Sequence, residues 1–150
     1  MKPASSLATL LLLASVPVLA LDRSALLIHA AQRVSVAHLD PGAPNVPLEQ
    51  WLANLAKVPV DDLQWRVEAC GASFDGLTGQ ICVEGRATLS PMAAAIVSVR
   101  IPASGGTLGP PGLYGAYVTH EASREPASSL RELQEDVAHM QLHPGRAEYN

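Results

Sequence analysis

Two segments decide the fold: Leu63-Gln64-Trp65-Arg66-Val67-Glu68-Ala69-Cys70 and, after a bend with three glycines, Ile81-Cys82-Val83-Glu84-Gly85-Arg86-Ala87-Thr88-Leu89. In each segment apolar and polar side chains alternate, and this is the period of a half-buried β-strand. The glycines of the bend supply the backbone freedom that a reversal of the chain requires. The sequence therefore predicts that the two segments form an antiparallel hairpin.

Cys70 and Cys82 are the two cysteines of the chain, and each falls on the polar face of its predicted strand. Facing cysteines on one side of a hairpin can reach the distance that a disulfide requires. We therefore predict a structural disulfide between them, which stabilises the fold by roughly 3 kcal/mol in the chain-entropy estimate. The charged residues of the same faces, Arg66, Glu68, Glu84 and Arg86, are predicted to pair across the strands.

Residues 1–20 have the layout of a secretory signal peptide. A run from Leu7 to Ala20 is apolar almost throughout, and Val18-Leu19-Ala20 places small residues before a cut after Ala20. The alternative is an uncleaved membrane anchor, which needs about 20 apolar residues, and Asp22-Arg23 interrupt the run before that length. We expect an exported protein, periplasmic or extracellular, in a compartment where a disulfide persists.

The charge pattern excludes some classes of partner. The chain has 10 basic and 14 acidic residues, with a net charge of −4, and no segment is a basic run. Nucleic-acid binding needs a positive footprint, so we expect no nucleic-acid partner. We also expect no cofactor and no stable membrane insertion after signal cleavage, and we leave open an unknown protein partner.

Residues 21–47 are expected to form an N-terminal arm and a proline-rich linker. Ser24–Ala31 is compatible with a short helix behind a serine cap, and Arg33–Ala37 alternates like a strand. The part from Asp40 to Pro47 is predicted to be a loop, because it contains Pro41, Gly42, Pro44 and Pro47. Residues 48–143 are expected to form a single α+β domain, and residues 144–150 a tail.

Two amphipathic helices are predicted in that domain. The first runs from Leu48 to Val58, and the second from Leu130 to about Leu142, after a capping box that begins at Ser129. Their apolar stripes consist of Leu48, Trp51, Leu52 and Leu55 in the first helix, and Leu130, Leu133, Val137 and Met140 in the second.

The segment Ser90–Ile101 allows two interpretations. Ser90-Pro91 is typical of a helix start, whereas the β-branched residues from Ile96 onward favour a third strand beginning near Ala93. Leu113–Thr119 is predicted to be a fourth strand, with Gly115 as a possible bulge position. The fold class predicted is α+β: a mostly antiparallel sheet of three to four strands, centred on the disulfide-stapled hairpin and packed by two helices.

If Ser90–Arg100 is helical, the element order from Leu48 becomes helix, strand, strand, helix, strand. That order resembles the small ferredoxin-like periplasmic domains of pilus and type II secretion assembly proteins, and Leu48–Leu89 is similar to them in pattern. The resemblance implies an alternative function, a membrane-anchored component of an envelope or pilus-type assembly.

The sequence contains no complete match to the nucleophile-elbow motif of hydrolases. The segment nearest to a Gly-x-Ser-x-Gly elbow is Gly71-Ala72-Ser73-Phe74-Asp75, which ends in Asp where the motif has Gly.

Glu135, His139 and His143 are spaced i, i+4, i+8, so on a helix they project from nearly one side and form a candidate metal site. The same spacing is typical of a solvent-facing helix surface.

We therefore expect a non-enzymatic exported binding or accessory module. The two alternatives are the anchored assembly component and a metal-binding protein that uses the C-terminal helix.

Overall fold

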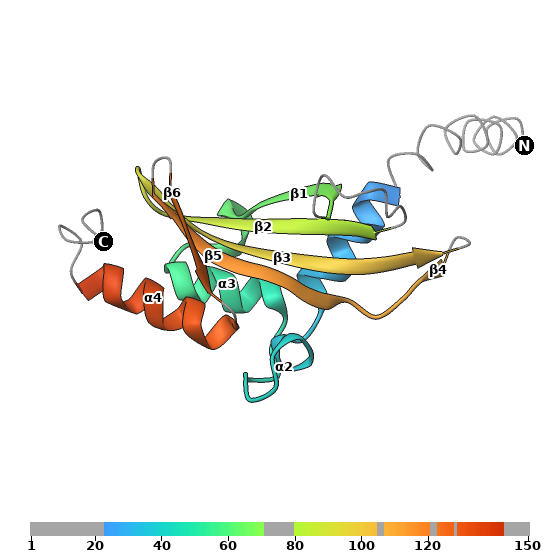
Figure 1. Cartoon of the computed structure of the whole chain (residues 1–150), viewed down its shortest axis with the longest axis horizontal. Coiled ribbons are helices and arrows are strands. Elements are labelled where there is room, and N and C mark those ends of the chain that lie inside the picture. The colour runs from blue at the N-terminus through green and yellow to red at the C-terminus, as the bar shows by residue number, and fades with distance from the viewer. Residues whose placement is uncertain (1–22, 71–79, 105–106, 121–122, 128, 143–150) are drawn as a thin grey trace, which may run out of the picture.

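A computed structural model describes residues 23–70, 80–104, 107–120, 123–127 and 129–142 (Figure 1). The chain is helical over residues 23–33. The elements that follow are α2 (Val36–Leu39), α3 (Leu48–Ala56), the 3-10 helix η1 (Val60–Asp62), β1 (Gln64–Ala69), β2 (Gln80–Ser90), β3 (Ala93–Ser104), β4 (Thr107–Leu108), β5 (Gly112–His120), β6 (Ser123–Ala127) and α4 (Leu130–Leu142). The predicted signal peptide, residues 1–20, and the predicted tail, residues 144–150, lie outside the described residues.

The strands form one antiparallel sheet in the order β1-β2-β3-β5-β6, and the short β4 pairs with the end of β3. Because each main strand lies beside the next along the chain, short connections join them, as antiparallel pairing allows. The α+β class and the antiparallel sheet predicted from the sequence are confirmed. The sheet extends further than expected through the short strands β4 and β6.

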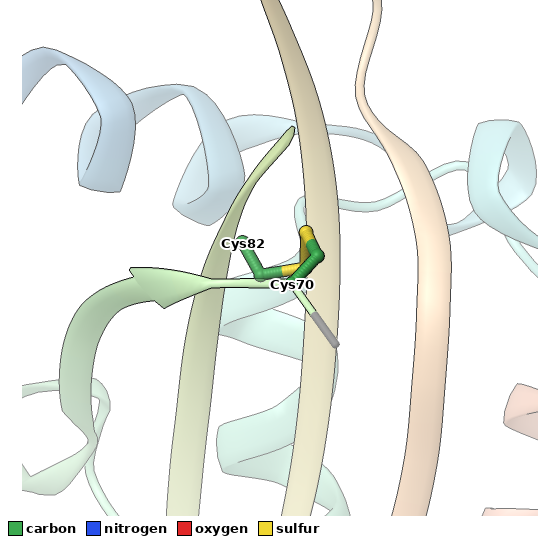
Figure 2. Close-up of a disulfide and its surroundings, with 2 residues drawn as sticks. All are labelled: Cys70 and Cys82. Atoms are coloured by element: carbon green, nitrogen blue, oxygen red, sulfur yellow. A yellow bond between two sulfur atoms is a disulfide. The ribbon is translucent and has the colours of Figure 1, made fainter. Parts of the chain in front are cut away.

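The predicted antiparallel pairing of the two central segments is confirmed. In β1 and β2, Arg66 lies opposite Glu84, and Glu68 lies opposite Cys82. Cys70, directly after β1, forms the predicted disulfide with Cys82, with a Cα–Cα distance of 5.0 Å (Figure 2). The disulfide therefore ties the end of β1 to β2.

β3 settles the two interpretations of Ser90–Ile101 in favour of a strand. It begins at Ala93, and Ser90 caps a tight turn in which its Oγ accepts a hydrogen bond from the Met92 amide at 3.2 Å. The helix on which the ferredoxin-like order depended is not formed, because residues 93–102 are extended and pair with β2 along its length. The register between β3 and β5 shifts opposite Tyr114, next to the predicted bulge position Gly115.

One face of the sheet is covered by helices. In Figure 1, α3 and α4 lie on the same side of the strands, where α3 packs against β2 and α4 against β5. Both helices were predicted, and the apolar stripes of both enter the core. The sheet contributes Val83, Ala87, Ala95, Val97, Val99, Ile101, Ala116 and Val118 to this core, and the helices contribute Leu48, Trp51, Leu52, Leu130, Leu133 and Val137.

The segment expected to be an arm packs into the same core. Leu27 and Ala31 of the N-terminal helical segment are buried, as are Val36 and Leu39 of α2. The alternating pattern of Arg33–Ala37 does not form a strand. Instead Ser35 caps α2 by accepting a hydrogen bond from the Ala37 amide, and makes one isolated bridge to Pro47. Burial of its apolar side chains thus makes residues 23–39 part of the packed fold.

Candidate functional site

The face of the sheet opposite the helices carries the polar side chains of the hairpin. Val83 and Ala87 point into the core, so the alternating residues Glu84 and Arg86 point to the other side. We call this side the open face because α3 and α4 lie on the other side, although Cys82, Glu84, Ile96 and Ser98 on it are buried. Its members on β1, β2 and β3 are Gln64, Arg66, Glu68, Cys82, Glu84, Arg86, Ile96, Ser98 and Arg100.

Arg66 is the centre of an ion-pair cluster on the open face. Its guanidinium Nη2 lies 3.1 Å from Glu68 Oε1 in the same strand, and 3.4 Å from Glu84 Oε2 across the hairpin. The predicted pairing across the strands is confirmed for Arg66 and Glu84, whereas Glu68 pairs with Arg66 along its own strand. One cation thus neutralises two carboxylates and joins β1 to β2 by side chains as well as by backbone.

Glu84 is the unusual member of this cluster because its side chain is only 9% exposed, whereas that of Arg66 is 68% exposed. A carboxylate removed from water requires a charged or hydrogen-bonding partner. Arg66 supplies the partner, and no side-chain nitrogen or oxygen buried among the described residues lacks a hydrogen-bond partner. The pairing of Arg66 with Glu84 therefore permits a buried charge at the base of the open face.

A shallow depression of about 440 Å³ lies beside the ion pairs. Its lining consists of Gln64, Trp65, Arg66, Glu84 and Arg86, and it opens to solvent. Small-molecule sites have volumes of roughly 300–1,000 Å³ but are enclosed and mostly apolar. A half-open depression with charged walls is better suited to a polar side chain or terminus of a larger partner than to a buried small molecule.

Arg86 is the available cation of this depression. Its side chain is exposed, and no ion pair or hydrogen bond engages it within the described part of the chain. It lies opposite Gln64 in the hairpin register. A guanidinium beside an amide offers several donors to one acceptor group, and the planar guanidinium fits a carboxylate with two parallel hydrogen bonds.

The open face is electrostatically different from the rest of the molecule. Across β1, β2 and β3 it carries the cations Arg66, Arg86 and Arg100 and the anions Glu68 and Glu84. The whole chain, in contrast, has a net charge of −4. Cations gathered on one face of an acidic protein direct anionic groups toward that face.

The candidate metal site is only partly within the described residues. Glu135 and His139 lie on α4, as expected, but Glu135 forms an ion pair with Arg131, with a distance of 3.7 Å. His143 lies outside the described residues. Among the residues that the structure does describe, no group of three or more potential metal ligands comes together. The segment Gly71–Asp75, which resembles a nucleophile elbow, is also outside the described residues.

No protein-family model matches the chain, and comparisons with curated proteins and with solved structures found no match either. The site must therefore be interpreted from its own chemistry.

None of the helices in the described part has the length and apolar character that a bilayer crossing requires. The disulfide indicates an oxidising environment outside the cytoplasm.

The sequence predicted the face on which these residues lie, but it did not predict a functional site there. The alternation of the hairpin placed Arg66, Glu84 and Arg86 on one face, and this is correct. It did not reveal that Glu84 is buried or that Arg86 has no partner among the described residues, because both depend on neighbouring strands. The signal available was the presence of two arginines, Arg66 and Arg86, on the polar face of the predicted hairpin.

Proposed function

We propose that this protein is an exported, non-enzymatic binding module that recognises an anionic group of a protein partner on its open face. One observation carries the proposal: Arg86 and Gln64 border an open depression, next to an Arg66 that Glu68 and Glu84 already neutralise. Arg86 thus supplies a cation for an external carboxylate. The disulfide supports this role, because it holds β1 and β2 in register and so keeps the two donors side by side.

The binding proposal is tested by affinity capture with the disulfide-bonded protein as bait, from the envelope fraction and culture medium of its native source. Proteins captured by the native bait are identified by mass spectrometry and compared with those captured by Arg86→Ala. Arg33→Ala is the matched control, since it removes the same charge from an exposed position in the helical segment. We expect a protein that the native and Arg33→Ala baits capture equally and that Arg86→Ala captures at least about tenfold less. Equal capture by all three baits contradicts the proposal.

Export itself is proposed to proceed by cleavage after Ala20, to give a mature chain that begins at Leu21. The apolar run of residues 7–20 and the disulfide support this proposal. The N-terminus of the native protein tests it by mass spectrometry. A chain in the soluble fraction that begins at Leu21 is the expected result, and an intact Met1 in the membrane fraction favours the anchored alternative.

A further inference from the structure

β1 is an edge strand of the sheet and lacks a proline that would protect the edge. In the described part of the chain β2 is its strand neighbour on one side, and no strand covers the other side. Its six residues contain no proline, whereas β6, at the opposite edge of the sheet, contains Pro126. A proline cannot donate to another strand and is a common protection of an edge. The backbone groups on the outer side of β1 are therefore placed to pair with a further strand.

The sequence of β1 is complementary to itself in charge. When two copies of β1 run antiparallel with Val67 opposite the second copy's Val67, each Arg66 lies opposite a Glu68. This arrangement repeats twice about a two-fold axis and creates two pairs of opposite charge. Cross-strand pairs of this kind stabilise an antiparallel ladder, and like charges destabilise it.

The neighbouring registers are disfavoured by the same charges. Centring the pair on Arg66 places two arginines opposite each other, and centring it on Glu68 places two glutamates opposite each other. A shift by one residue sets Arg66 opposite Val67, so that the open face of one copy continues into the core face of the other. The register centred on Val67 is the one that satisfies both the faces of the sheet and the charges.

The side chains that this pairing needs are accessible. The Arg66 side chain is 68% exposed and that of Glu68 is 37% exposed. In a single copy they pair with each other at 3.1 Å along the strand, so association exchanges the one exposed pair of each copy for two pairs between the copies. Arg66 keeps Glu84 as its partner beneath. The Cys70–Cys82 disulfide holds the end of β1 against β2, which reduces the ordering that association requires.

We propose that the protein forms a symmetric homodimer through antiparallel pairing of two β1 edges about Val67, so that the sheets of both copies become one continuous sheet. A six-residue edge buries less area than the roughly 1,600 Å² of a standard interface. The dimer is therefore reversible, with a dissociation constant on the order of micromolar. This inference is independent of the proposed function, which rests on Arg86.

The first test is sedimentation velocity of the purified, disulfide-bonded protein from about 1 to about 200 µM, a range around the expected dissociation constant. The native protein should shift from monomer to dimer across this range. Glu68→Arg places two arginines opposite each other at both Arg66–Glu68 contacts of the dimer. Its dissociation constant should therefore be at least about tenfold higher than that of the native protein. Glu135→Arg, which makes the same charge change on α4, should dimerise like the native protein.

The second test uses two variants that repel themselves but attract each other. Arg66→Glu and Glu68→Arg each place like charges across the edge, whereas their equimolar mixture places opposite charges at both contacts. The mixture should therefore restore association as a heterodimer. Circular dichroism confirms that each variant is folded, and Glu68→Arg alone decides the question if Arg66→Glu does not fold.

A native protein that stays monomeric throughout the range overturns the proposal. The charges of Arg66 and Glu68 would then keep the β1 edge from pairing with other chains. A Glu68→Arg variant that dimerises like the native protein also overturns it, because the interface then lies elsewhere. Folded variants whose mixture fails to associate overturn the proposed register.

Discussion

Gly85 is the residue on which the packing of the hairpin depends most closely. A Cβ atom at this position would lie 2.6 Å from Cζ3 of the Trp65 ring, which occupies the space above the glycine on the facing strand. Trp65 in turn packs against the hydrophobic core. The absence of a side chain at position 85 therefore allows an indole ring to lie flat on the sheet.

We predict that Gly85→Ala lowers the free energy of unfolding by about 1–3 kcal/mol, because the added methyl group displaces the indole ring. Urea unfolding followed by tryptophan fluorescence measures the change. Gly112→Ala is the control, since the nearest atom to its added Cβ, an Arg100 nitrogen, lies at 3.8 Å, an ordinary contact distance. Equal stability of Gly85→Ala and the native protein would contradict the packing described.

At the scale of elements, the N-terminus of α4 depends on a residue 90 positions earlier in the chain. Asp40 Oδ2 accepts hydrogen bonds from the amides of Leu130, at 2.9 Å, and Arg131, at 3.3 Å. The predicted serine cap is also present, because Ser129 Oγ accepts from the Glu132 amide at 3.1 Å. A carboxylate at a helix N-terminus satisfies free amides and interacts favourably with the helix dipole.

Asp40→Ala is predicted to lower the free energy of unfolding by about 1 kcal/mol, through loss of this second cap. Thermal unfolding followed by circular dichroism measures the effect. Asp61→Ala, which removes an exposed acidic side chain from η1, should change stability by less than about 0.5 kcal/mol. An Asp40→Ala variant as stable as Asp61→Ala would show that Ser129 alone suffices to cap α4.

For the whole molecule, the Cys70–Cys82 disulfide is the covalent restraint of the sheet. It joins residues 12 positions apart and ties the edge strand β1 to the centre of the sheet through β2. Its contribution arises mainly from the unfolded chain, whose freedom it restricts. Burial of Cys82, which is 1% exposed, protects it from exchange with external thiols.

Reduction of the disulfide is predicted to lower the free energy of unfolding by about 3 kcal/mol without changing the sheet. Guanidinium unfolding with and without a reductant measures this difference, and a thiol count confirms that reduction is complete. The Cys70→Ala, Cys82→Ala double variant should match the reduced protein. If all three forms unfold at the same midpoint, the disulfide does not stabilise the fold.

Much of the fold could be predicted because its signals are local. The alternation in β1 and β2, the apolar stripes of α3 and α4, and the strand preference of Ile96–Ile101 all depend on residues within one element. The packing of residues 23–39 has no such local signal, because the helical segment is short and the loop after it contains several prolines, so that only contact with the core makes this segment part of the fold. The cap by Asp40 and the burial of Glu84 are contacts between distant segments, and no local pattern contains them.

The sequence by itself determined the hairpin, the disulfide and the two amphipathic helices, because period and side-chain chemistry along a single segment specify these features. The tertiary structure alone decided which face of the sheet remained open, that Glu84 is buried beneath Arg66 while Arg86 has no partner within the described chain, and that β1 became an edge. The physical reason is that burial and strand order are properties of the assembled layers. They depend on which segments the hydrophobic core brings together, and not on any one of them.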